Sequence, residues 1–157
     1  MNTPALKFRP RRKTSFNRLP FVGRQDDGAP NFWSVPLTGG YYGGTKAGGE
    51  LAALMLIHLR QHGQDQFAHG RLGQVATAWL DAARTATPEQ YSALRGQVLG
   101  FMGTLSPWLI AAAKQNGKNL DTADRHAILR SANRWLAFDD SALFADQDEL
   151  TALKREG

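Results

Sequence analysis

Apolar side chains recur at intervals of three and four residues along much of the chain, which is the spacing of one face of an α-helix. Residues 71–85 carry the clearest such pattern, so we predict an amphipathic helix there. A second helix is predicted from Thr45 to about His62, with Gly63 following its end. Its apolar residues surround it on most sides, which is typical of a helix buried at the centre of a domain.

Short capping motifs predict where further helices begin. Thr87-Pro88-Glu89-Gln90 supplies an N-cap, a proline at the first helical position and a glutamine that closes a capping box. Ser106-Pro107 repeats the cap and the proline, so we expect a new helix to begin there and to run to Asn116. Further helices are expected over about 122–137 and 147–155.

These patterns divide the chain into three regions. Residues 1–24 combine proline with basic residues and show no periodicity, so we expect a flexible or extended basic arm, in which at least Leu19 to Val22 dock on the body or on a partner. Residues 25–49 are rich in glycine and aromatic residues, which predicts turns. Residues 50–157 are predicted to be a helical body. The expected fold is therefore mostly α, a single domain of five to six helices over residues 25–157.

Charge is distributed unevenly along the sequence. The first 24 residues hold seven lysines and arginines and no acidic residue, whereas the remainder holds 12 basic and 14 acidic residues. The net charge of +5 therefore belongs to the arm, and the body is nearly neutral. A concentrated positive segment of this kind typically binds a polyanion or an acidic protein surface.

The composition limits the classes of function. The chain contains no cysteine, so disulfides, thiolate metal sites and cysteine nucleophiles are excluded. The longest apolar run, residues 51–57, is far shorter than the roughly 18 residues of a membrane span. The first 24 residues contain no apolar segment of the kind found in secretory signals. We expect a cytoplasmic protein without a membrane partner.

Motifs that would indicate catalysis, a metal site or a helix-turn-helix are incomplete in this sequence. Gly44-Thr45-Lys46 approaches a phosphate-binding loop, but lysine and threonine are exchanged relative to that motif. His58 and His62 have the spacing of helical metal ligands, but Leu59 stands where a zinc protease carries glutamate. The segment around Gly117 matches a helix-turn-helix poorly. We therefore predict no enzyme, no catalytic residues, no cofactor and no metal site.

Small residues recur along the predicted helix that begins at Pro88. Ser92, Gly96, Gly100 and Gly103 let another helix approach closely, whereas glycine by itself weakens a helix. We interpret this spacing as core packing, and a self-association face is the alternative.

Nucleic-acid binding is the leading functional hypothesis. Basic side chains neutralise phosphates, and interleaved phenylalanines stack on unpaired bases. On the helix predicted over 122–137, His126 and Asn133 share with two arginines the face opposite the apolar stripe, although an ordinary solvated face is the alternative there. The predicted nucleic-acid contacts are Arg9, Arg11, Arg12, Lys13, Arg18, Arg130 and Arg134, with Phe8 and Phe16 stacking or anchoring.

Two other hypotheses remain open from sequence. One is a protein-binding adaptor or inhibitor, for example an accessory protein of a phage or plasmid, whose arm docks on an acidic partner surface. In that case Phe8, Phe16, Trp33, Tyr41 and Tyr42 are the expected partner contacts, because aromatic residues on glycine-rich loops form strong anchors. A self-assembling subunit is the third hypothesis, and it predicts concentration-dependent oligomers that survive deletion of residues 1–24.

Overall fold

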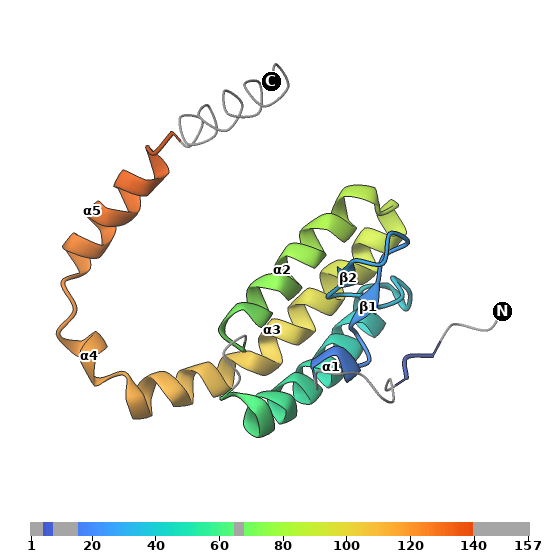
Figure 1. Ribbon diagram of the computed structural model, residues 1–157, viewed down its shortest axis with the longest axis horizontal. Helices are drawn as coiled ribbons and strands as arrows, with labels where there is room; N and C mark the ends of the chain where they lie inside the picture. The colour runs from blue at the N-terminus through green and yellow to red at the C-terminus, as the bar shows by residue number, and fades with distance from the viewer. Residues whose placement is uncertain (1–4, 8–15, 65–67, 140–157) are drawn as a thin grey trace, which may run out of the picture. The chain divides into compact units, whose positions relative to one another are not determined.

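The computed structural model describes residues 5–7, 16–64 and 68–139 (Figure 1). Helices dominate these residues, which confirms the predicted mostly α fold. The chain divides into two compact units after Lys114. The elements, in order, are η1 (Phe16–Arg18), β1 (Gly23–Arg24), β2 (Pro30–Asn31), α1 (Gly40–His62), α2 (Ala68–Thr85), α3 (Pro88–Asn116), α4 (Lys118–Asp121) and α5 (Arg125–Leu136).

Helices α1 and α3 pack with their backbones in contact, and glycines make this possible. A Cβ atom added to Gly100 of α3 would collide with the carbonyl oxygen of Thr45, and one added to Gly48 of α1 would collide with that of Gln97. Gly44 and Gly96 are in equally close contact with the opposite helix. The small residues of α3 therefore serve intramolecular packing, as predicted, at Gly96 and Gly100.

Helix α1 begins earlier than the sequence predicts. The helix was expected to begin at about Thr45, but it starts at Gly40, directly after Gly39 in the left-handed conformation (φ 82°). The glycines in this stretch serve helix packing rather than turns. Gly44 and Gly48 accommodate the backbone of α3 at close range.

Helix α3 also differs from the prediction, because it continues through Pro107 to Asn116. Ser106 does not cap a new helix. Its hydroxyl donates a hydrogen bond to the Met102 carbonyl oxygen (2.8 Å), one turn earlier within the same helix. The predicted start at Thr87 is confirmed: the Gln90 amide donates to the Thr87 hydroxyl (3.3 Å), and the Gln90 side chain accepts from the Thr87 amide (2.9 Å).

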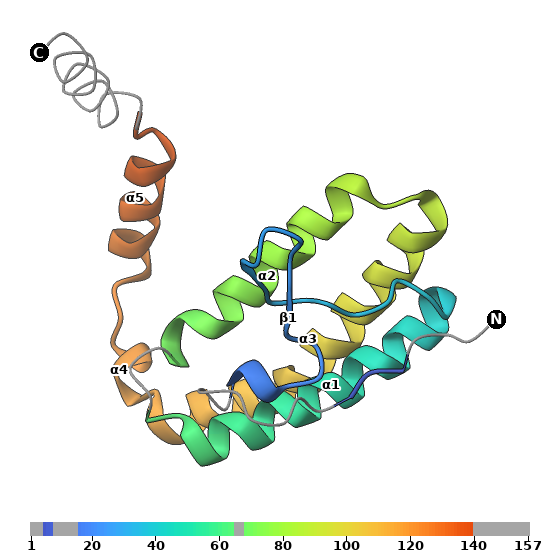
Figure 2. The same ribbon diagram turned by 45° about the vertical axis from the view of Figure 1, so that its right-hand side comes forward.

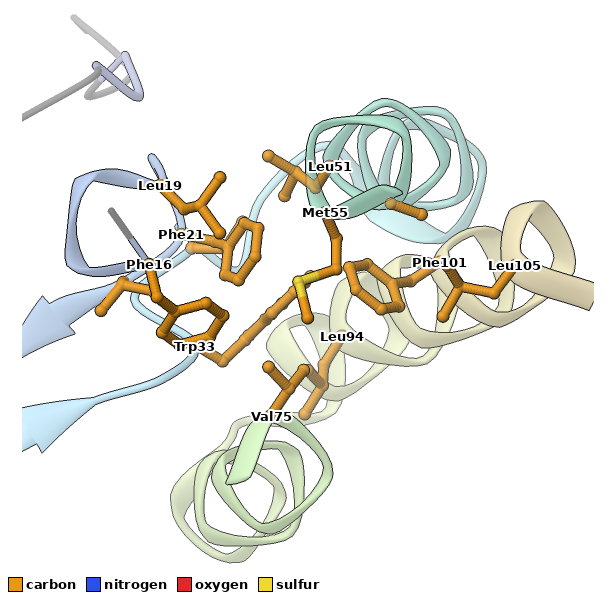
Figure 3. Close-up of a cluster of buried hydrophobic side chains, with 13 residues drawn as sticks. Phe16, Leu19, Phe21, Trp33, Leu51, Met55, Val75, Leu94, Phe101 and Leu105 are labelled. Carbon is orange, nitrogen blue, oxygen red and sulfur yellow. The ribbon is translucent and has the colours of Figure 1, made fainter. Parts of the chain in front are cut away.

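The second half of the predicted basic arm packs on the helices, and Leu19 to Val22 dock on the body as expected. Phe16, Leu19, Phe21 and Val22 are all buried in the core that α1, α2 and α3 form (Figure 3). They pack there because they are apolar, and residues 16–24 are therefore part of the folded unit. Residues 1–4 and 8–15 lie outside the described residues.

The segment from η1 to Val35 lies across one side of the helices (Figure 2). β1 and β2 form a minimal antiparallel hairpin, in which Gly23 pairs with Asn31. The hairpin is followed by Trp33, whose ring contacts Phe21, Trp79 and Phe101 at centroid distances of 5.3–5.4 Å. The N-terminal segment thus completes the core rather than extending from it.

In the second unit, α5 occupies most of the helix predicted over 122–137. The Asp124 side chain caps it by accepting from the Ala127 amide (3.0 Å). Neither α4 nor α5 contains a buried residue. The helix predicted over 147–155 lies outside the described residues. None of the helices in the described ranges is long and apolar enough to cross a membrane.

Candidate nucleic-acid and partner interfaces

The densest part of the predicted nucleic-acid site lies outside the described residues. This part comprises Phe8, Arg9, Arg11, Arg12 and Lys13. The cations on either side of it, Lys7 and Arg18, are described and exposed to solvent, as is Arg24 in β1. The described ends of the basic segment therefore present positive charge at the surface.

Phe16 and Trp33 were expected to contact a nucleic acid or a partner, and this expectation is corrected. Phe16 is 1% exposed and Trp33 is 3% exposed. Two kinds of contact fix the Trp33 side chain. Its indole N–H donates a hydrogen bond to the Gln97 side-chain oxygen (3.0 Å), and its ring packs against other aromatic rings. Neither side chain is available for an external ligand, since both are needed in the core.

Phe16 joins the basic segment to the helices through two contacts that the sequence did not reveal. The Arg71 guanidinium of α2 lies 4.6 Å from the centre of the Phe16 ring, in cation–π geometry. The His58 ring of α1 lies 5.4 Å from the same ring. Because these residues are far apart in sequence, no local pattern could have paired them. The contacts of Arg71 and His58 fix Phe16, the residue at which the basic segment enters the folded unit.

The ring centroids of His58 and His62, whose spacing is that of helical metal ligands, are 5.3 Å apart, and His58 is buried. Within the described ranges, no group of three or more histidine, aspartate or glutamate side chains is placed to hold a metal ion. The two histidines therefore lack further ligands of these types in the described part of the chain. His58 instead packs against Phe16, as a core residue does.

The polar face of α5 forms the second predicted site, and the structure brings its residues together. Arg130, Asn133 and Arg134 line a shallow hollow with Ala127 and Ala137. The Arg130 guanidinium lies 3.9 Å from the Asp124 carboxylate, and both side chains are more than 60% exposed. An ion pair this exposed contributes little, so Arg130 stays accessible to an external anion.

A largely apolar groove of about 480 Å³ lies between α2 and α3. The sequence did not predict it, because its walls come from three helices. It is lined by Tyr41, Ala76, Trp79, Leu80, Ala83, Tyr91, Leu94, Arg95, Val98 and Leu99. The Trp79 indole N–H is buried and has no hydrogen-bond partner in the described part of the chain. Tyr41, predicted as a partner contact, thus lies in an apolar groove.

Tyr42, the other predicted tyrosine contact, is 74% exposed at the start of α1. The Lys46 ammonium, one turn later, lies 5.4 Å from the centre of its ring. Tyr42 is thus an accessible aromatic surface residue beside a positive charge.

Comparison with known proteins gives no further guide to function: no protein family model matches the chain, and no curated protein or solved structure is significantly similar to it.

Proposed function

We propose that this is a non-catalytic cytoplasmic binding protein whose basic N-terminal segment contacts nucleic acid or a nucleoprotein complex. The observation that carries the proposal is the run of seven cations without an acid in residues 1–24. Phosphate contacts of this kind release counterions from the nucleic acid and supply most of the binding free energy.

The position of this run relative to the core supports the proposal. The dense cations, Arg9 to Lys13, end three residues before Phe16, which is buried. Because the basic segment is attached to a folded unit, it can bring its positive charges to a phosphate backbone without a separate binding pocket. Arg18, at the end of η1, continues the positive charge onto the surface of the folded unit.

Helix α5 supplies a second basic element in this proposal. It contains three arginines and no acidic residue, and two of the arginines share a hollow with Asn133. Arginine and asparagine are suited to phosphate and base-edge contacts. Replacing Arg130 and Arg134 by glutamine is expected to weaken binding about 3- to 10-fold, whereas an ordinary solvated face predicts no change.

Fluorescence anisotropy with labelled single- and double-stranded DNA and RNA tests the proposal. The full chain is expected to bind, and the affinity should fall steeply as salt rises. Absence of binding to all four probes at low salt would overturn it. Deletion of residues 1–24 is not a suitable control, because it also removes Phe16 and Phe21 from the core.

The groove between α2 and α3 favours a second candidate, a protein-binding adaptor. Exposed aromatic side chains at an apolar groove, here Tyr41 and Tyr91, are typical anchors for a partner protein. If the arm docks on an acidic protein surface, a labelled acidic polypeptide should bind more tightly than nucleic acid. Tyr41→Ala, which removes an aromatic side chain from the groove, should then weaken binding more than any single arginine substitution does. The opposite ranking would leave nucleic-acid binding as the function.

A further inference from the structure

The C-terminal half of α3 is apolar, and the described residues of its own unit do not cover it. Residues 96–113 contain no charged residue. The first part of this stretch packs on α1, but from Ser106 to Lys114 every residue is exposed. Trp108, Leu109 and Ile110 are 55–63% exposed. A helix that is apolar on all sides is normally buried, so this half of α3 requires a cover that the described residues of its own unit do not supply.

The exposed side chains form a seam along α3. Leu99, Met102 and Leu109 are 52%, 43% and 55% exposed, and with Ser106 they follow the spacing i, i+3, i+7, i+10. This alternation of three and four residues is the pattern by which one helix packs along another over several turns. The seam extends beyond the groove between α2 and α3, which ends at Leu99.

Gly103 lies beside this seam, and no described residue packs closely against it. A Cβ atom added to it would meet nothing within 4 Å, whereas those added to Gly96 and Gly100 would collide with α1. Because glycine has no side chain, a second helix can approach the backbone of α3 closely at this position.

From these observations we propose that α3 binds α3 of a second copy of this chain, in antiparallel orientation about a two-fold axis near Thr104. The seam is self-complementary in this arrangement, because Leu99 faces Leu109 and Met102 faces Ser106. Gly103 lies close to the axis and lets the two backbones approach. No charge lies within residues 96–113 to oppose the contact.

The amount of apolar surface fits a second copy. Four large side chains on or beside the seam, Leu99, Met102, Leu109 and Ile110, expose on the order of 400 Å² on each copy, roughly half of the ~800 Å² per partner that a stable interface buries. A two-fold contact uses the same patch twice, so one chain supplies both sides of the interface. This dimer goes beyond the proposed function and does not depend on it.

Sedimentation equilibrium of the full chain over about 1–100 μM tests the proposal. We expect a reversible dimer of twice the 17.3 kDa chain mass. Because the contact is uncharged, salt should leave association unchanged or strengthen it, in contrast to nucleic-acid binding. Leu109→Glu should raise the dissociation constant at least 10-fold. The matched control is Ile57→Glu on α1, where the side chain is 52% exposed, and it should leave the dimer intact. A wild-type monomer at 100 μM, or equal effects of the two variants, would overturn the proposal.

Cysteine cross-linking tests the orientation and remains informative if Leu109→Glu fails to fold. The chain has no cysteine, so single cysteines report cleanly. A mixture of Leu99→Cys and Leu109→Cys chains should form the mixed disulfide dimer, and each variant alone should form little. Cross-linking of Leu109→Cys with itself as fast as in the mixture would overturn the antiparallel arrangement.

Discussion

Gln97 shows how single residues organise the core of this protein. It is 1% exposed and joins two parts of the N-terminal segment, since its side chain accepts from the Trp33 indole and its amide donates to the Pro36 carbonyl oxygen (2.8 Å). Sequence alone could not predict this role, because more than 60 residues separate Gln97 from both partners. The capping box at Thr87, in contrast, was predicted correctly because all its atoms lie within one helical turn.

Gln97→Leu is therefore expected to destabilise the fold. The substitution leaves the Trp33 N–H and the Pro36 carbonyl without their partner in a buried site, and each such group costs about 1–3 kcal/mol. Urea denaturation should show a free energy of unfolding lower by about 2–4 kcal/mol. Gln61→Leu, at an exposed position of α1, is the control, and equal effects of the two substitutions would contradict this role.

Gly100→Ala should also destabilise the protein, because the new methyl group would meet the Thr45 carbonyl oxygen. Moving α1 away from α3 to relieve this contact should cost about 1–3 kcal/mol, as overpacking does. Gly73→Ala on α2 meets nothing within 4 Å and should instead stabilise by about 0.5–1 kcal/mol, through helix propensity. Thermal unfolding of both variants distinguishes the two effects, and a gain in stability for Gly100→Ala would contradict the close packing.

At the scale of elements, periodicity predicted the helices well and their ends less well. The bounds of α2 and α5 agree closely with the ranges predicted from their apolar spacing, because amphipathic spacing is a local property. The start of α1 and the continuity of α3 were mispredicted. Glycine and proline were interpreted there as breaks, whereas the contact between α1 and α3 selects glycine for close approach, and Ser106 bonds back within the helix. Tertiary packing overrode the local preference in both cases.

The proline inside α3 gives a prediction at this scale. Pro107 removes one backbone hydrogen bond and crowds the preceding turn, so Pro107→Ala should raise the free energy of unfolding by up to about 3 kcal/mol. Pro88→Ala is the control. Pro88 occupies the first turn of the same helix, where proline is favourable, so no gain is expected. Equal gains by both variants, measured in urea, would show that position within the helix does not determine the effect.

At the scale of the whole molecule, sequence predicted the separation of charge from the body but misplaced its boundary. The basic segment contributes Phe16, Leu19 and Phe21 to the core. The same segment therefore carries both the positive charges and part of the core, and the two are not separate modules. The groove between α2 and α3 and the uncovered half of α3 were not predicted, since both depend on how helices pack. The apolar surface is available for protein contacts, while the basic segment is the element suited to a polyanion.

The most direct test of nucleic-acid binding compares two full-length variants of equal charge in a salt series. One replaces Arg9, Arg11, Arg12 and Lys13 by glutamine, and the control replaces the exposed cations Arg60, Arg84, Arg95 and Lys114. Each phosphate contact contributes about −0.9 to the slope of log affinity against log salt on duplex DNA. We predict that the first variant loses most of its affinity and that its slope becomes shallower by up to about 3–4, while the control binds almost as the wild type does. Equal losses in both variants would contradict the account, because binding would then follow net charge rather than the N-terminal segment.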